Sequence, residues 1–352
     1  MRPTKLGIIG LGAIGGSLAL QAKRAGIATV LGWSPEPGER VAAARQGAID
    51  DAPSRAADVA RAVELLVLAA PPAANLHLLG SLKPHVGAGA LITDVGSVKR
   101  AIVARADALG LGPRFAGGHP LAGTHEHGFV AARGDLFKGA VVYITSTRDG
   151  NGAAREVAHF WESVLEAHPV LIDAAQHDRQ LALTSHLPQA VASLLAHYLA
   201  RAAPPGATFG PGARDATRLA ASEPALWTEI FLMNRDELLP ALRSLEQPLR
   251  VIARAIRLAN RDAHVPGESR EQQGALDLRA RDGRRVDERA QAAAVDRERQ
   301  RVAALLLDFG AHGAERLGDP PHRPAPQRRV SGERRREALA RKDTQHQARG
   351  GA

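Results

Sequence analysis

Residues 5–15 of the chain read KLGIIGLGAIG, an apolar strand-like run that leads into the pattern G-x-G-x-x-G. Gly10 permits the tight turn, Gly12 lets the backbone approach a pyrophosphate, and Gly15 lets a helix pack closely on the strand. Backbone amides at the start of that helix, including those of Ala13 and Ile14, would face the phosphate charge. Because strand and helix patterns flank the motif, it predicts a dinucleotide-binding unit rather than a plain glycine turn.

Short apolar, β-branched runs alternate with helical patterns over the first 172 residues. Such alternation is typical of an α/β Rossmann-like domain with a parallel, doubly wound sheet. We expect a dinucleotide-binding domain over residues 1–172. The expected strands are 5–10, 29–33, 65–69, 90–94, 114–118, 140–144 and 169–172, and the expected helices are 14–25, 39–46, 73–82, 98–109 and 153–165.

The pattern becomes helical after Asp173, with periodic stretches over 174–202, interrupted only by Pro188, and over 215–221 and 224–257. Long helices with apolar faces and no sheet to cover usually pack on one another or on a partner subunit. Residues 173–262 are therefore expected to form an all-α domain that binds substrate and dimerises.

The last part of the chain, residues 263–352, is rich in Arg, Ala, Gly and Pro, with one apolar helical stretch at 302–309. This composition is typical of disorder. Out-of-frame translation of a GC-rich gene would give the same mixture, and the sequence does not choose between the two. No alternation of strands and helices there predicts a ligand-sensing regulatory domain.

Composition excludes several classes of protein. The chain has no cysteine, which excludes a disulfide scaffold, cysteine-bound zinc and iron–sulfur chemistry. Its net charge is +9, but roughly +5 of that comes from the tail, so the rest gives little reason to expect a nucleic-acid partner. We find neither a signal-peptide pattern nor an apolar run of the ~18–20 residues that span a membrane. The expectation is a cytoplasmic protein without a membrane or nucleic-acid partner.

The residue that reads the cofactor ribose should follow the second strand. Ser34 stands where an acidic residue would bind the 2′-hydroxyl of NAD. Glu36 could supply the acid instead. No Arg or Lys follows at once to accept the 2′-phosphate of NADP, although Arg40 lies one turn away. The cofactor is therefore expected to be NAD or NADP, and the missing cation favours NAD.

Three motifs downstream carry polar side chains: DVGSVK (94–99), GGHPLAGT (117–124) and TSHLPQ (184–189). Ligands of open α/β sheets bind beyond the carboxyl ends of the strands, which would place Ser97 and His119 beside the cofactor. A histidine has the near-neutral pKa that acid–base catalysis needs. Taken alone, His119 would be a turn residue and Ser97 a helix N-cap, so their assignment depends on the neighbouring motifs.

A metal site is not expected. The segment His125-Glu126-His127 has potential ligands, but its spacing is not that of a helix-borne zinc pair and no third ligand is evident. These residues are expected to lie in a loop near the substrate entrance.

Together the motifs resemble the prephenate/arogenate dehydrogenase family over about residues 5–256. The matching segments are the glycine loop, 94–99, 117–124, 185–188, RDATR (214–218), SEP (222–224) and Trp227.

The resemblance implies oxidative decarboxylation in tyrosine biosynthesis. Hydride leaves C4 of a cyclohexadienyl carboxylate for the nicotinamide, the C4 hydroxyl gives its proton to His119, and CO2 leaves as the ring becomes aromatic. By the same resemblance Ser97 orients the histidine and the hydroxyl, Arg218 pairs with a substrate carboxylate, and a homodimer is expected. The remaining implied substrate contacts are His186, Gln189, Thr124 and Trp227.

One departure from the family pattern bears on the substrate. Many members carry a second histidine where this chain has Gln189, so the choice between prephenate and arogenate stays open. The competing hypotheses are another two-domain oxidoreductase of the β-hydroxyacid dehydrogenase or imine reductase type, and a nucleotide sensor without activity. The first usually has a catalytic lysine in the first long helix, which is missing here, and the second has no use for Ser97, His119 and Arg218 together.

Overall fold

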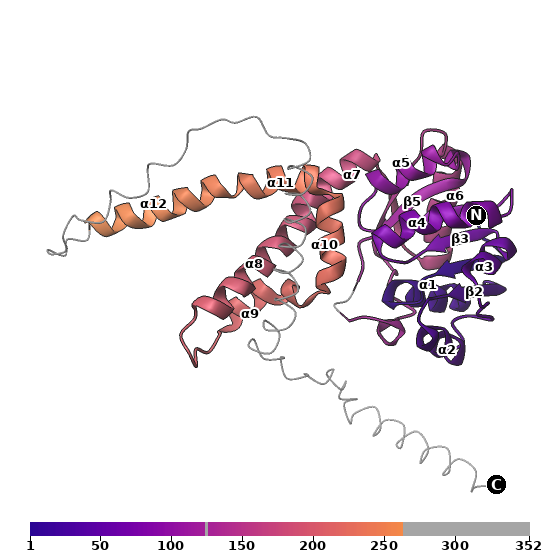
Figure 1. Cartoon of the computed structure of the whole chain (residues 1–352), viewed down its shortest axis with the longest axis horizontal. Coiled ribbons are helices and arrows are strands. Elements are labelled where there is room, and N and C mark those ends of the chain that lie inside the picture. The colour runs from indigo at the N-terminus through magenta and orange to yellow at the C-terminus, as the bar shows by residue number, and fades with distance from the viewer. Residues whose placement is uncertain (124–125, 263–352) are drawn as a thin grey trace, which may run out of the picture. The chain divides into compact units, whose positions relative to one another are not determined.

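The computed structural model describes residues 1–123 and 126–262. The expectations for the tail 263–352 and for Thr124 and His125 fall outside the described residues. Figure 1 shows a sheet covered by helices, followed in the chain by a set of helices. Both predicted classes of structure are thereby confirmed.

A seven-stranded sheet has the order β2-β1-β3-β4-β5-β6-β7. Every neighbouring pair is parallel except β5–β6, which is antiparallel. Parallel neighbours need a long crossover, usually a helix, and only a 3-10 turn, Phe129–Ala131, is found in the described part of the β5–β6 connection. The strands are β1 (Lys5–Ile9), β2 (Thr29–Trp33), β3 (Leu65–Leu68), β4 (Leu91–Asp94), β5 (Phe115–Pro120), β6 (Val141–Ser146) and β7 (His168–Leu171).

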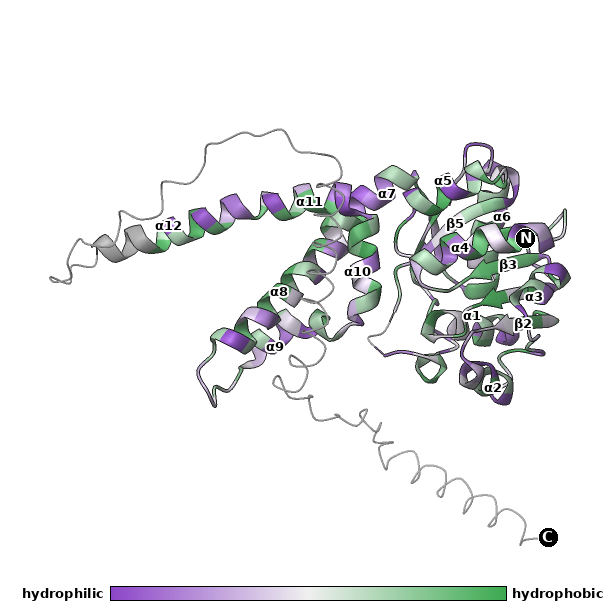
Figure 2. Ribbon diagram, in the orientation of Figure 1, coloured by the Kyte–Doolittle hydropathy of each residue, from purple (hydrophilic) through white to green (hydrophobic). Residues whose placement is uncertain are grey.

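Both faces of the sheet are buried. Along β3, Leu65 and Val67 belong to one buried apolar cluster, whereas Leu66 and Leu68 belong to another. Side chains alternate between faces of a strand, so a strand buried on both sides is apolar throughout, as the green colour of β3 in Figure 2 illustrates. The covering helices are α1 (Ala13–Arg24), α2 (Pro37–Arg45), α3 (Ala56–Ala62), α4 (Pro72–Leu82), α5 (Arg100–Ala108) and α6 (Asn151–Leu165). The sequence analysis had not predicted α3.

The helical part differs from its prediction at three points, one of which is that the stretch 215–221 is α-helical only to Thr217, in a helix that begins at Pro211. The stretch 174–202 contains a π-helical turn, Ala182–His186, after which Pro188 falls in the first turn of the next helix, where its missing N–H costs little. The predicted helix 224–257 is divided at Asn234 and Leu245. The helices are α7 (Ala174–Leu181), α8 (Leu187–Ala202), α9 (Pro211–Thr217), α10 (Pro224–Met233), α11 (Arg235–Ser244) and α12 (Glu246–Asp262). Over residues 1–123 and 126–262, no helix has the length and apolarity that a membrane span requires.

Candidate active site

The glycine loop between β1 and α1 has the geometry of a phosphate cradle. A Cβ on Gly10 (φ +102°) would lie 2.6 Å from a backbone oxygen, and a Cβ on Gly15 would lie 1.8 Å from the Gly10 carbonyl oxygen. Gly12 is different, because in the described part of the chain the nearest heavy atom outside its own segment is Glu39 Oε1, at 3.7 Å from the Cβ position. Gly10 and Gly15 therefore serve the turn and the packing, and Gly12 leaves room beside the backbone.

The first turn of α1 begins at Ala13 without a side-chain cap on its amides. Uncapped amides at a helix N-terminus bind anions. Together with the open space at Gly12, this arrangement fits the pyrophosphate of a dinucleotide.

A carboxylate lies at the expected ribose position, and it comes from a residue the sequence analysis did not name. Buried Ser34 follows β2, and its hydroxyl donates to Glu39 Oε2 at 2.5 Å. Glu39 lies in the first turn of α2, five residues beyond Ser34. Its other oxygen is the atom near Gly12. The helix that follows β2 thus places a carboxylate beside the glycine loop, which a search at the strand end itself could not find.

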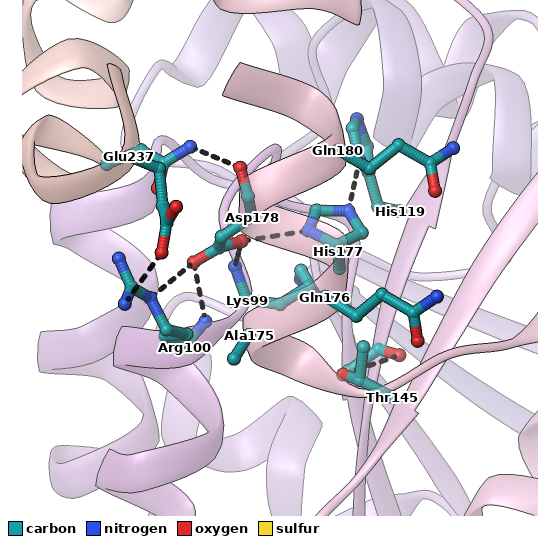
Figure 3. A network of polar contacts seen from close by, with 12 residues as sticks. Lys99, Arg100, His119, Thr145, Ala175, Gln176, His177, Asp178, Gln180 and Glu237 are labelled. Carbon is teal, nitrogen blue, oxygen red and sulfur yellow. Dashed lines mark hydrogen bonds and ion pairs between the residues drawn. The ribbon is translucent and has the colours of Figure 1, made fainter. Parts of the chain in front are cut away.

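His119, at the end of β5, belongs to a buried chain of hydrogen bonds (Figure 3). Its Nδ1 lies 2.8 Å from Nε2 of His177, whose own Nδ1 lies 2.8 Å from Oδ1 of Asp178. Both partners belong to α7, and all three side chains are buried. The sequence analysis missed His177 and Asp178, although an adjacent His-Asp pair opening the first helix of the helical part was a visible signal.

Asp178 also caps helix α5. Its two carboxylate oxygens accept hydrogen bonds from the backbone N–H groups of Lys99, at 2.7 Å, and of Arg100, at 2.9 Å. Ser97 is therefore not the N-cap that its local sequence favours, because a carboxylate from α7 fills that role. Ser97 is half-buried in the loop between β4 and α5, and its side chain makes no hydrogen bond within the described residues, to His119 or to any other group.

A buried ion pair between Asp94 and Lys99, the first and last residues of the segment DVGSVK, lies beside the site. Lys99 Nζ lies 2.5 Å from Asp94 Oδ2 and donates to the carbonyl oxygen of Gly118 at 2.8 Å. Both charged side chains are almost fully buried. Since Gly118 directly precedes His119, the pair ties the end of β4 to the strand segment that carries the histidine.

The site histidines are held neutral. Burial is the main cause that lowers the pKa of His119 well below its ordinary 6.5, and the neighbouring His177, Lys99 and His186 add to the effect. Burial likewise lowers the pKa of His186 to about 4. A neutral imidazole can accept a proton at neutral pH, as a general base must.

His186 and Trp227 lie close together in the helical part of the chain. His186 is buried in the π-helical turn, its ring centroid is 6.1 Å from that of Trp227, and its Nδ1 lies 3.0 Å from the Asn234 side-chain nitrogen. Its Nε2 is buried without a hydrogen-bond partner among the described residues. Asn234 is a further site residue that the sequence analysis missed.

Gln189 and Arg218 have contrasting surroundings. Gln189 is buried and donates to the Leu219 carbonyl oxygen at 2.7 Å, so part of its hydrogen-bonding capacity is used within the protein. Arg218 is exposed and has no ion pair within the described residues. Arg214 donates to the Phe209 carbonyl oxygen at 3.0 Å.

A glycine loop of the dinucleotide-binding type and a buried histidine lie on the same sheet, an arrangement that suits a nicotinamide-dependent oxidoreductase. Comparison with known proteins gives the family. The model for the prephenate dehydrogenase nucleotide-binding domain matches residues 18–170, and that for the prephenate dehydrogenase dimerization domain matches residues 173–266. The chain belongs to the prephenate dehydrogenase family.

Relatives cover most of the described chain. Prephenate dehydrogenase of Bacillus subtilis is 35% identical over 240 residues, which are 66% of this chain and 64% of that protein. This chain therefore spans slightly less than two thirds of its length. Cyclohexadienyl dehydrogenase of Zymomonas mobilis is 32% identical over 260 residues, 71% of this chain and 88% of the relative.

Two solved structures share the architecture. Prephenate dehydrogenase from Aquifex aeolicus, in complex with hydroxyphenyl propionate and NAD+, aligns with a TM-score of 0.67 at 29% identity and covers 73% of this chain and 92% of its own. Synechocystis arogenate dehydrogenase aligns with a TM-score of 0.61 at 30% identity, covering 73% and 93%.

Proposed function

We propose that this chain catalyses the NAD(P)-dependent oxidative decarboxylation of prephenate or arogenate in tyrosine biosynthesis. The observation that carries the proposal is the buried, neutral His119, which is fixed through Nδ1 to His177 and leaves Nε2 for a substrate hydroxyl. Membership of the family supports this reaction over that of a β-hydroxyacid dehydrogenase or an imine reductase.

The residues of the chain can serve each part of this reaction. When bound over Gly12, a nicotinamide dinucleotide supplies the acceptor for the hydride that leaves C4 of the cyclohexadienyl ring. The C4 hydroxyl gives its proton to His119 Nε2 as the carbon–oxygen bond gains double-bond character. The bond between ring and carboxylate then breaks, its electron pair enters the ring and CO2 leaves. His119 returns the proton to the phenolic oxygen.

Substrate binding is assigned to Arg218, His186, Gln189, Thr124 and Trp227, with Ser97 beside the reacting hydroxyl. The exposed guanidinium of Arg218 suits a bidentate contact with a carboxylate. Thr124 lies outside the described residues, so its role rests on the family resemblance alone. The division into domains 1–172 and 173–262 is likewise part of the proposal.

The stoichiometry of the reaction tests the proposed function. Purified protein with prephenate or arogenate and an oxidised nicotinamide should release one CO2 for each reduced nicotinamide formed. Reduction of the nicotinamide without release of CO2 would instead indicate a simple alcohol dehydrogenase and overturn the proposal.

We propose NAD rather than NADP as the cofactor, with Glu39 as the residue that reads the ribose. A carboxylate at this position binds the two ribose hydroxyls and repels a 2′-phosphate. Its contact with Ser34 Oγ fixes the side chain next to the glycine loop.

The variant Glu39→Gln is expected to raise the KM for NAD+ by roughly 10- to 100-fold, the range of a lost hydrogen bond to a charged group. The preference for NAD+ over NADP+ should become smaller, because the Glu39 carboxylate no longer repels the 2′-phosphate of NADP+. Initial rates with each cofactor at fixed substrate measure both effects, and Glu36→Gln is the matched control. If the ratio of kcat/KM for NAD+ to kcat/KM for NADP+ is the same in Glu39→Gln and in the wild type, Glu39 does not have this role.

The variant Arg218→Ala is expected to raise the KM for the substrate by roughly 10- to 100-fold, with a smaller change in kcat, because a charge-assisted pair with a carboxylate is lost. Arg214→Ala is the matched control, since Arg214 bonds a backbone carbonyl of its own segment. Equal KM values for Arg218→Ala and the wild type would withdraw the assigned contact.

The pH dependence should show a base with a lowered pKa. Because burial moves the pKa of His119 below 6.5, the neutral form persists as the pH falls through 6.5. The pH dependence of kcat/KM reports the pKa values of groups in the free enzyme. We therefore expect kcat/KM to fall only below pH 6.5. An acid limb centred above pH 6.5 would contradict a buried neutral base.

A homodimer formed through residues 173–262 is also proposed. Its support is the match to a dimerization domain and the exposure of Leu249, Val251, Ile252 and Ile256 on α12, since exposed apolar side chains on one helix indicate a partner surface. The expected cytoplasmic location stays a prediction.

A further inference from the structure

We propose that His177, Asp178 and Asn234 hold the two site histidines in opposite tautomers, so that His119 presents a bare Nε2 and His186 presents an Nε2–H. The two rings would then act as a proton acceptor and a hydrogen-bond donor at one site. This inference rests on the proposed function for the use of the two nitrogens, but the tautomers themselves follow from hydrogen bonds within the chain.

The first step starts at the Asp178 carboxylate. An ionised carboxylate only accepts hydrogen bonds, and two backbone amides, those of Lys99 and Arg100, donate to this one. Although burial opposes ionisation, the hydrogen bonds from His177 and these amides leave the pKa of Asp178 below its ordinary value. His177 must therefore donate from Nδ1, at 2.8 Å. Burial keeps His177 neutral by lowering its pKa, so its Nε2 carries no proton.

The second step fixes His119. The bare Nε2 of His177 lies 2.8 Å from Nδ1 of His119. Two unprotonated ring nitrogens would not approach so closely, so Nδ1 of His119 holds the hydrogen. A neutral imidazole has only one ring N–H, and Nε2 of His119 is consequently bare. This nitrogen is the one that takes the substrate proton.

The third step fixes His186 in the other tautomer. The side-chain nitrogen of Asn234 lies 2.7 Å from the backbone carbonyl oxygen of Asp178, an atom that only accepts, so the orientation of this amide is determined. The same nitrogen lies 3.0 Å from His186 Nδ1, which must therefore accept. The hydrogen of neutral His186 then sits on Nε2, the atom that is buried without a partner among the described residues.

A buried donor without a partner costs free energy unless a ligand satisfies it. The Nε2–H of His186 is suited to a carboxylate or carbonyl oxygen of the substrate, whereas the bare Nε2 of His119 is suited to a hydroxyl. Asp178 determines both tautomers. Its side chain sets that of His119 through His177, and its backbone oxygen sets that of His186 through Asn234. His177, Asp178 and Asn234 are thus positioning residues that act through the two histidines.

Nitrogen NMR of the full-length protein tests the proposal without any turnover. In histidine-labelled (¹⁵N) protein near pH 7, two-bond ¹⁵N–¹H correlations distinguish the two neutral tautomers, and the variants His119→Gln and His186→Gln assign the signals. We expect the Nδ1–H form for His119 and the Nε2–H form for His186. The same tautomer for both rings, or the reverse pair, would overturn the proposal. An inactive protein with the expected tautomers would reject the proposed function alone.

Two variants connect the tautomers to catalysis. His177→Phe removes the acceptor for His119 Nδ1 and is expected to lower kcat by roughly 10²-fold with little change in KM, while His177→Gln, which keeps an acceptor, should recover part of that loss. Asn234→Asp offers only acceptors, so His186 should shift to the Nδ1–H form and the KM for the substrate should rise roughly tenfold.

Gln180→Met serves as the matched control, because Gln180 lies on the same helix and the one hydrogen bond of its side chain within the described residues is donated to the Tyr143 hydroxyl, at 2.6 Å. Thermal unfolding establishes that each variant is folded. If folded His177→Phe keeps the kcat of Gln180→Met, or folded Asn234→Asp keeps the Nε2–H form of His186, the positioning roles are wrong.

Discussion

Replacing His119 by asparagine is expected to lower kcat by roughly 10²- to 10⁴-fold, the usual contribution of a general base, with a much smaller change in KM. Asparagine can still donate toward His177 from about the position of Nδ1, but it has no atom at the position of Nε2. The variant therefore keeps the buried hydrogen-bond chain and loses only the proton acceptor. Steady-state kinetics with saturating cofactor measures the effect.

His168→Asn is the matched control, because His168 is an exposed histidine on β7. It should leave kcat unchanged. If the kcat of folded His119→Asn lies within about threefold of that of the control, the loss is far smaller than the contribution of a general base. This result would show that His119 is not the base.

Replacing Lys99 by methionine is expected to lower the free energy of unfolding by about 3–5 kcal/mol, the cost of leaving one partner of a buried ion pair without the other. The Asp94 carboxylate would remain buried beside an apolar side chain, and the Gly118 carbonyl oxygen would lose its donor. Since this oxygen directly precedes His119, activity should fall as well. Urea unfolding of the wild type and the variant measures the change in stability.

The exposed pair Lys138–Glu166, with an N–O distance of 2.8 Å, provides the comparison. Lys138→Met should change stability much less, because surface ion pairs contribute little. Equal losses in Lys99→Met and Lys138→Met would contradict the account of the buried pair. The double variant Lys99→Met with Asp94→Leu should be more stable than Lys99→Met alone, since it removes the unpaired charge.

The sequence predicted those features that depend on neighbours in the chain. Strands such as β2 and β3 are short apolar runs between turn residues, and the glycine loop carries its own geometric requirements. The antiparallel β5–β6 pair was not predictable from such runs, because strand direction depends on the connection. Helix α3 was missed because its seven residues give little periodicity.

The site was predicted less completely than the fold, for a physical reason. His119 stands in a motif and could be named, but its partner His177 lies 58 residues away and the Asp178 cap of α5 lies 78 residues from Arg100. Asn234 and Glu39 likewise act through contacts that only folding creates. Local capping preference pointed to Ser97, and a side chain from another helix fills that position instead.

The central claim is most directly tested by initial rates in the four combinations of prephenate or arogenate with NAD+ or NADP+, followed as the absorbance of the reduced nicotinamide. The account predicts turnover of at least one of the two substrates, faster with NAD+ than with NADP+. Folded protein that turns over neither substrate with either cofactor would contradict it.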